Sequence, residues 1–265
     1  MPLDANIIST AFLCFWLAVL GAVLGSFLDC AVSRWAAGEA WHTGRSRCTS
    51  CGRTLGAAEL VPVFSFLFCR GRCRHCGGRI PAECLIAELA GAGAFACLGA
   101  RFGPGWVLVQ WLIAAALLLW LSLVDWKKQV IPDFLLLALA ANRILWYFPA
   151  ERPEAGELPG RLAQLLLSQA VPAGLLTLVL LAERLWGREV MGGGDLKLLF
   201  ALALYLSWAE LLLGLLLACL LGLLCAALAG KEKGAAVPFG PFLSAGAALS
   251  VCFGGPVITW YFSLF

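Results

Sequence analysis

The stretch "VMGGGDLKLLFALAL" (residues 190–204) places three glycines and an aspartate in front of an apolar run. Similar runs recur along the whole chain, in which 62% of the 265 residues are hydrophobic and only 13% are charged. This composition is typical of a multi-span membrane protein, because each span needs about 20 apolar residues to cross about 30 Å of hydrocarbon. Asp195 therefore stands at the mouth of an expected membrane helix, where a carboxylate is costly and is a functional candidate.

The apolar runs predict an all-α polytopic membrane protein with about eight transmembrane helices. Two runs are weaker than the others, since 134–148 contains Asn142 and Arg143 and 196–208 is short. The predicted helices cover residues 7–28, 83–100, 106–124, 134–148, 162–182, 196–208, 210–229 and 239–262. No basic segment precedes the first helix and no cleavage site ends it, so we expect a retained helix rather than a signal peptide.

The distribution of Lys and Arg predicts the orientation of these helices, because positive residues collect in cytoplasmic loops. With the N-terminus outside, the inner loops hold most of the positive charge, including eight Arg between Arg34 and Arg79. We therefore predict a cytoplasmic loop at 34–82 and an outer loop at 149–161. The net charge of +3 reflects this topology and gives no support to nucleic acid as a partner.

The loop at 34–82 contains two CxxC pairs, "CTSC" (48–51) and "CRHC" (73–76), each followed by a glycine that permits a tight turn. The pairs resemble a zinc ribbon, in which Cys48, Cys51, Cys73 and Cys76 hold one tetrahedral Zn²⁺. Disulfides are the alternative, but a reducing cytoplasm disfavours them. Because all four ligand positions are filled, we expect a structural zinc that supplies much of the folding energy of this small loop.

Two further residues of the loop are weaker ligand candidates. Cys69 could be a spare ligand, although a CxxC partner has the better geometry, and His75 could compete for the metal from inside the second pair. His42 and His75 are the only histidines. With neither near a clear Ser or Cys partner, a His-based nucleophilic triad is not expected.

Two carboxylates stand at the predicted cytoplasmic ends of their helices, Asp125 after the third apolar run and Asp195 before the sixth. Two carboxylates that meet at one depth can share a proton and activate water, which is aspartic protease chemistry. The glycines at 192–194 would let a substrate strand approach them. The structural alternatives are that Asp195 is a helix N-cap, that Asp125 pairs with Lys127 or Lys128, and that Asp133 is a first-turn acid.

These motifs together resemble the type IV prepilin leader peptidase family, which are bacterial membrane aspartic proteases of the GxGD class. Besides the CxxC pairs, the resemblance covers "GSFLDCAVSRW" (25–35), "VDWKKQVIPD" (124–133), "GGGDLKLL" (192–199) and "PFGPFLSAGA" (238–247). It implies that Asp125 and Asp195 are catalytic, the second in a GxGD motif with Gly192 and Gly194. Asp133 of the Pro-Asp pair and Lys197 of the D-x-K pattern are expected to support them.

The resemblance implies cleavage of the basic leader from prepilins or pseudopilins at the cytoplasmic face of the bacterial inner membrane. It also implies methylation of the new N-terminal amine by S-adenosylmethionine. No glycine-rich nucleotide loop is visible, so a methyl-donor pocket would have to be irregular, between the zinc loop and the bundle, and its residues are unknown. Two residues depart from the family, because Asp29 stands where Asn is usual and Val190 where a further glycine is common. Asp29 is therefore also a candidate third membrane-edge carboxylate.

We predict three parts in the chain: the first transmembrane helix at 1–33, the zinc loop domain at 34–82 and the membrane-embedded protease bundle at 83–265. The expected partners are prepilin or pseudopilin substrates and membrane lipid, and the oligomeric state is left open. A transporter or channel is the alternative, in which Asp29, Asp125, Asp195 and Arg143 would line an ion path. It would leave the GxGD loop and both CxxC pairs unexplained. A scaffold for pilus or secretion machinery is a third reading, which would need neither catalytic aspartate.

Overall fold

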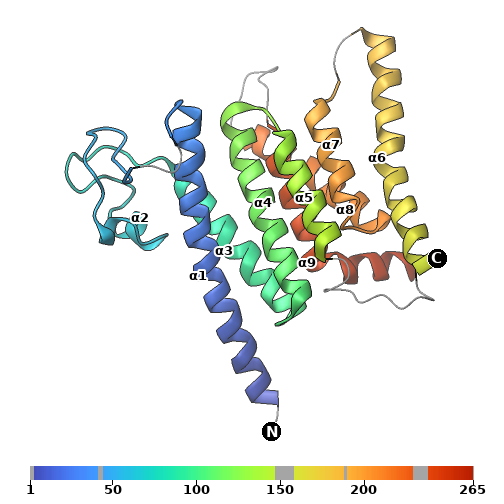
Figure 1. The fold of residues 1–265 in the computed structure, drawn as a ribbon, viewed down its shortest axis with the longest axis horizontal. Coiled ribbons are helices and arrows are strands. Elements are labelled where there is room, and N and C mark those ends of the chain that lie inside the picture. The colour runs from blue at the N-terminus through green and yellow to red at the C-terminus, as the bar shows by residue number, and fades with distance from the viewer. Residues whose placement is uncertain (1–2, 41–43, 147–157, 188–189, 229–237, 265) are drawn as a thin grey trace. The chain divides into compact units, whose positions relative to one another are not determined.

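The computed structural model describes residues 3–40, 44–146, 158–187, 190–228 and 238–264, and these ranges are almost wholly helical (Figure 1). The helices are α1 (Leu3–Ala36), α2 (Phe64–Phe68), α3 (Ala82–Phe102), α4 (Trp106–Lys128), α5 (Asp133–Trp146), α6 (Leu158–Trp186), α7 (Gly193–Leu202), α8 (Trp208–Leu228) and α9 (Gly240–Phe262). The segment between α1 and α3, residues 37–81, is called the cysteine loop. The all-α membrane fold class expected from the apolar runs is confirmed for the described residues.

Six of the described helices are long and apolar enough to cross a membrane, namely α1, α3, α4, α6, α8 and α9. The predicted number of about eight is therefore too high for the described residues, and the two weakest runs account for the difference. The described part of α5 has 14 residues and α7 has only 10. α7 ends at Leu202 because Ser207 starts the next helix, its amide and hydroxyl donating to the Glu210 carboxylate at 2.9 and 2.8 Å. The turn between them is itself apolar, so hydropathy does not reveal the break.

The residue contacts divide the chain into two compact units, Met1–Lys128 and Gln129–Phe265. In the first unit, α1 and α3 lie side by side and meet through small residues (Figure 1). A Cβ added to Gly21 would overlap the carbonyl oxygen of Gly91, and one added to Gly25 would overlap that of Ala87. Small residues permit this close approach of two membrane helices. α4 joins them through Val124, which packs into the core of the unit.

The second unit contains α5 to α9, and α8 and α9 meet through another glycine pair, Gly214 and Gly246. Polar contacts inside this unit explain why the apolar run at 134–148 contains an arginine. Arg143 Nε donates to the carbonyl of Leu204 at 2.8 Å, and its guanidinium lies 5.7 Å from the centre of the Tyr205 ring. Arg143 thus satisfies a backbone carbonyl in the turn after α7, which is a structural role.

Candidate active site and metal site

The two CxxC pairs form two hairpin turns of the same design in the cysteine loop. In the first, the Cys48 amide donates to the Arg53 carbonyl at 2.9 Å, and the Gly52 amide donates to the Cys48 carbonyl at 2.9 Å. The same two bonds recur around Cys73 in the second. Gly52 and Gly77 have φ values of 71° and 69°, which glycine adopts without steric cost. The glycine after each pair is therefore required by the turn, as the sequence indicated.

The turns bring four sulfur atoms together, from Cys48, Cys51, Cys73 and Cys76, all within 4.8 Å of one another. The Sγ atoms of Cys48 and Cys76 are 3.8 Å apart. Thiolates bound at about 2.3 Å to a tetrahedral Zn²⁺ are about 3.8 Å from one another. The four side chains thus fit one zinc ion, with no position left for a water ligand.

The chemistry of the cysteine loop agrees with this ligand set. The backbone N–H groups of Cys51 and Ser50 lower the pKa of the Cys48 thiol to about 6, and the thiolate is the form that binds metal. Neither Cys69 nor His75 belongs to the sulfur group. Cys69 instead accepts a hydrogen bond from Nε of Arg74 at 3.2 Å. His42 lies outside the described residues.

Asp125 is a buried carboxylate in an apolar helix. It lies three residues before the end of α4, is only 5% exposed, and follows the buried residues Leu123 and Val124. Taking a carboxylate out of water costs several kcal/mol unless it is paired or protonated, as a rough expectation. An ionisable residue buried in a spanning helix is a functional candidate by default.

Asp195 lies in the first turn of α7, and its side chain is half-buried. The N-cap position belongs to Gly192, whose carbonyl accepts the Asp195 amide at 3.1 Å. The alternative that Asp195 is itself the N-cap is therefore wrong. Its carboxylate turns back over the start of the helix, because a Cβ added to Gly192 would lie 3.2 Å from the Asp195 Oδ2 atom. The positive end of the helix favours an anion at this position.

The three glycines before Asp195 have different surroundings. A Cβ on Gly194 would come within 3.0 Å of the Ile131 Cβ, so the residue before Asp195 must be small. A Cβ on Gly193 would meet nothing within 4 Å. Among the described residues of the second unit, the x position of the GxGD motif therefore has no close neighbour, whereas both flanking glycines are constrained.

Asp133 and Lys197 form an ion pair between the start of α5 and α7. The Lys197 Nζ lies 2.7 Å from the Asp133 Oδ1, and both side chains are mostly exposed. The pair ties the first turn of α7, and with it Asp195, to α5. An exposed pair of this kind contributes about 0–1 kcal/mol to stability.

The sequence did not reveal a buried polar cluster around Asp29. Its Oδ1 accepts from the Lys127 Nζ at 2.7 Å and its Oδ2 accepts from the Cys84 Sγ at 2.9 Å. Lys127 also donates to the Ser33 hydroxyl and lies 3.6 Å from the Glu83 carboxylate. Asp29 is thus the counter-charge of Lys127. The one available signal was an unusual acid in α1 together with a Lys at the end of α4.

The second lysine at the end of α4 has a different neighbour, because the Lys128 Nζ lies 5.5 Å from the centre of the Trp35 ring. Of the predicted site residues, Asp125 belongs to the first unit, and Asp133, Asp195 and Lys197 belong to the second. The approach of Asp125 to Asp195 therefore stays a prediction.

Comparison with known proteins covers both units. Residues 19–102 match the family model described as the bacterial peptidase A24 N-terminal domain, and residues 112–227 match that of the type IV leader peptidase family. A protein of Bacillus subtilis (strain 168) named prepilin leader peptidase/N-methyltransferase is 34% identical over 94% of this chain and 97% of its own. Proteins of the same name from Burkholderia pseudomallei (strain 1026b) and Aeromonas salmonicida (strain A449) are 36% and 31% identical, over 90% and 83% of this chain and 84% and 75% of theirs. No solved structure matches.

Proposed function

Because this chain belongs to the type IV leader peptidase family, we propose that it is a membrane endopeptidase that cleaves the leader from prepilins or pseudopilins and methylates the new N-terminus. The relatives are named for both activities. The observation that carries the proposal is Asp125, a buried carboxylate near the end of an apolar helix and part of the family motif. An ionisable side chain at this position in a spanning helix is a functional-site candidate by default.

Cleavage follows from two carboxylates that share one proton. The ionised member of the Asp125–Asp195 pair takes a proton from a water molecule, whose oxygen attacks the scissile carbonyl. The protonated member donates to the carbonyl oxygen, and the tetrahedral intermediate collapses when the leaving amine gains a proton. This chemistry requires that the two residues approach each other, which is part of the proposal.

The start of α7 suits a substrate backbone. The open surroundings of Gly193 leave room beside Asp195 for an extended peptide, and small residues at this place expose backbone groups. The Asp133–Lys197 pair holds this turn in position, so we assign both residues a positioning role. A substrate helix would have to unwind at its cleavage site, because a scissile bond within a helix is closed to attack.

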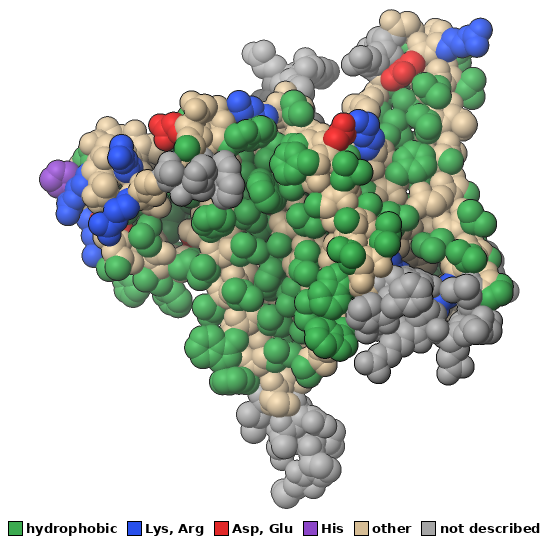
Figure 2. Space-filling model, viewed as in Figure 1, with side chains coloured by type: hydrophobic (Ala, Val, Ile, Leu, Met, Phe, Trp, Pro, Cys, Tyr) green, Lys and Arg blue, Asp and Glu red, His purple; other side chains and the backbone are tan. Residues whose placement is uncertain are grey.

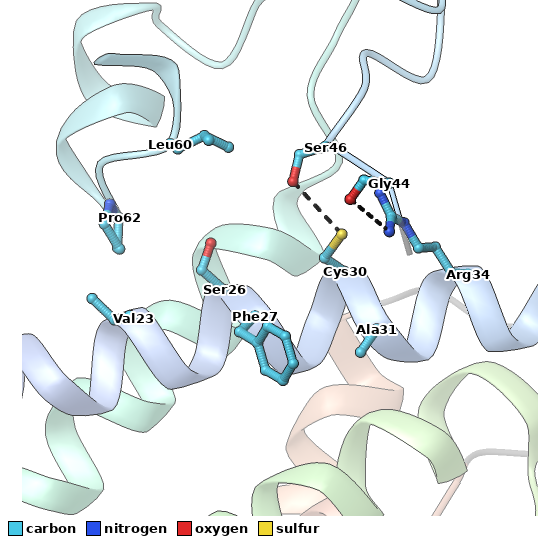
Figure 3. A pocket seen from close by; sticks show the side chains of 10 residues that line it. All are labelled: Val23, Ser26, Phe27, Cys30, Ala31, Arg34, Gly44, Ser46, Leu60 and Pro62. Atoms are coloured by element: carbon cyan, nitrogen blue, oxygen red, sulfur yellow. Dashed lines mark hydrogen bonds between the residues drawn. The ribbon is translucent and has the colours of Figure 1, made fainter. Parts of the chain in front are cut away.

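Methyl transfer needs a second site. S-adenosylmethionine would supply the methyl group there, and the new N-terminal amine that receives it would lose a proton. A cavity of about 270 Å³ between α1 and the cysteine loop supports the proposal of a donor site there (Figure 3). Ser26, Cys30 and Ser46 supply polar atoms, and Arg34 supplies a cation suited to the donor's carboxylate.

The proposed location is the bacterial inner membrane, with the N-terminus outside and the cysteine loop and both aspartates on the cytoplasmic side. The six apolar helices and the relatives support a multi-pass inner-membrane protein, and the excess of Arg in the cysteine loop supports the orientation. We propose zinc as a structural ion, bound by the four thiolates, that stabilises the loop and takes no part in peptide cleavage.

The test is cleavage of a synthetic prepilin by the purified protein in lipid, with leader release and methyl transfer measured separately. We expect Asp125→Asn and Asp195→Asn each to lower leader release by about 10²–10⁴-fold, while both still methylate a pre-cut pilin. Glu39→Gln removes an exposed carboxylate of the cysteine loop and serves as the matched control. Leader release at the wild-type rate by either aspartate variant would refute the catalytic pair.

A further inference from the structure

Helix α2 carries an exposed apolar surface that the described part of the chain does not cover. None of its five residues is buried, and Phe64, Leu67 and Phe68 are 61%, 60% and 77% exposed. Leu60 and Val61, just before it, are also exposed. The exposed residues Leu60, Val61, Phe64, Leu67 and Phe68 together are called the α2 patch. Large contiguous apolar surfaces of this kind mark contacts with another molecule or with a membrane.

A hydrogen bond sets the position of α2 along α3. The Val63 amide, at the start of α2, donates to the Glu88 Oε2 at 2.6 Å. Val63 has a φ of 63°, which is rare for a β-branched residue and is held here by the contact with the buried Glu88 carboxylate. Glu88 follows Glu83 by five residues in α3. The start of α2, which contacts Glu88, is therefore about 8 Å from Glu83 along the axis of α3.

The contacts of the cysteine loop with α1 place it at a similar distance from the charged residues. Asp29 of α1, Glu83 at the start of α3 and Lys127 near the end of α4 form a charged cluster, which is a natural level for lipid headgroups. Leu60 and Pro62 lie over the cavity that Val23 also lines (Figure 3). Because Val23 comes six residues before Asp29 in the span Ser9–Ala36, it is about 9 Å further into that span.

The surface beside α2 faces lipid on independent grounds. Leu20 of α1 and Ile86 of α3 are exposed apolar residues of spanning helices, and neither lines the cavity under the cysteine loop. Figure 1 shows α2 beside the middle of α1 rather than beyond its C-terminal end. Figure 2 shows apolar side chains along the lower edge of the cysteine loop and basic ones on its outer part. The α2 patch thus continues the lipid-facing surface of α1 and α3.

We propose that the α2 patch inserts into the bilayer leaflet on the side of the cysteine loop, and so holds this loop against the membrane. The depth of about 8–9 Å matches the 5–10 Å at which interfacial helices bury their apolar face. Arg70 and Arg72 follow α2 and are exposed, which suits the phosphates of anionic lipids. The partner is lipid itself. The inference rests on the membrane location of α1 and α3 and is independent of peptidase activity.

The test uses the whole protein in nanodiscs of phosphatidylethanolamine and phosphatidylglycerol. A photo-reactive benzoylphenylalanine replaces Phe68, Phe12 as a lipid-facing reference on α1, or His75 as an exposed control in the second CxxC pair. After illumination, mass spectrometry measures the fraction of protein that carries a covalently bound lipid. Retention of one zinc per chain shows that each variant has folded, and Leu67 offers a second position on α2 if the first variant loses its metal.

We expect lipid adducts at position 68 within a few-fold of those at position 12, and about tenfold above those at position 75, because only the first two would reach acyl chains. Adducts at position 68 no more frequent than at position 75 would overturn the proposal. Crosslinks from position 68 to protein in place of lipid would also overturn it, since the patch would then bind a second copy or another protein. Leader cleavage is measured in parallel, so that failure of the lipid contact is distinguishable from failure of the proposed enzyme.

Discussion

The ion pair between Asp29 and Lys127 is expected to stabilise the first unit. Replacing the lysine should lower the free energy of unfolding more than replacing the aspartate. The two side chains are 5% and 15% exposed, and their charged atoms are 2.7 Å apart. Lys127→Met leaves the Asp29 carboxylate to accept from the Cys84 thiol, a weaker donor without a positive charge. Because a buried charge without its partner is strongly unfavourable, we expect a loss of about 3–5 kcal/mol in the free energy of unfolding.

Asp29→Leu has the smaller expected cost, because Lys127 keeps the Ser33 hydroxyl and the Glu83 carboxylate at 3.6 Å. We expect a loss of about 1–3 kcal/mol for this variant. Combining Asp29→Leu with Lys127→Met removes both charges, and apolar replacement of a whole buried pair is often neutral. The double variant should therefore be more stable than Lys127→Met alone.

The assay is thermal unfolding of the full chain in one lipid preparation, followed by tryptophan fluorescence. For Lys127→Met we expect a fall in Tm on the order of 10 °C. Lys128→Met is the matched control, because Lys128 is exposed and its ammonium faces the Trp35 ring; its expected cost is about 0.5–1 kcal/mol. The reasoning is refuted if Lys127→Met costs no more than Lys128→Met, or if the double variant is less stable than both single ones.

Three further predictions concern the candidate sites. Gly193→Ala should leave leader cleavage within a few-fold of wild type, because its Cβ would meet none of the described residues within 4 Å, whereas Gly194→Leu should abolish cleavage. Equal rates for the two variants would contradict the geometry of the α7 turn. Cys48→Ser combined with Cys73→Ser should remove zinc, measured by elemental analysis, and expose the cysteine loop to protease, while unchanged zinc content would rule out the four-thiolate site. Lys197→Gln should lower stability by less than about 1 kcal/mol, since the pair is exposed, and a larger loss in thermal unfolding would show that the ion pair is structural.

Much of the architecture was predictable because hydropathy is a local property of the sequence. The apolar runs identified the spanning helices, and the CxxC-Gly pattern identified both turns and all four members of the sulfur group. For the described residues, the same method predicted about eight spans where six helices are long and apolar enough to cross a membrane. It assigned 196–208 to one helix, whereas α7 ends at Leu202, because an apolar turn has the same hydropathy as an apolar helix.

The sequence was also sufficient to select the candidate site residues, because the spacing of the family motifs matches Asp125, Asp195, Asp133 and Lys197. Their surroundings were not. Spacing leaves open whether Asp195 caps α7, and the structure assigns that position to Gly192. It also leaves open the partner of Lys127, for which the sequence suggested the neighbouring Asp125.

Tertiary structure alone decided which polar groups meet. Lys127 reaches Asp29 from 98 residues away, Lys197 reaches Asp133 from 64, and Glu88 holds the amide of Val63 across the α2–α3 connection. Each contact depends on how one helix is rotated and shifted along another, and small residues such as Gly21 and Gly91 set that register in the first unit. Hydropathy records how apolar a segment is; rotation and register are properties of the packed pair, and so only the folded units contain them.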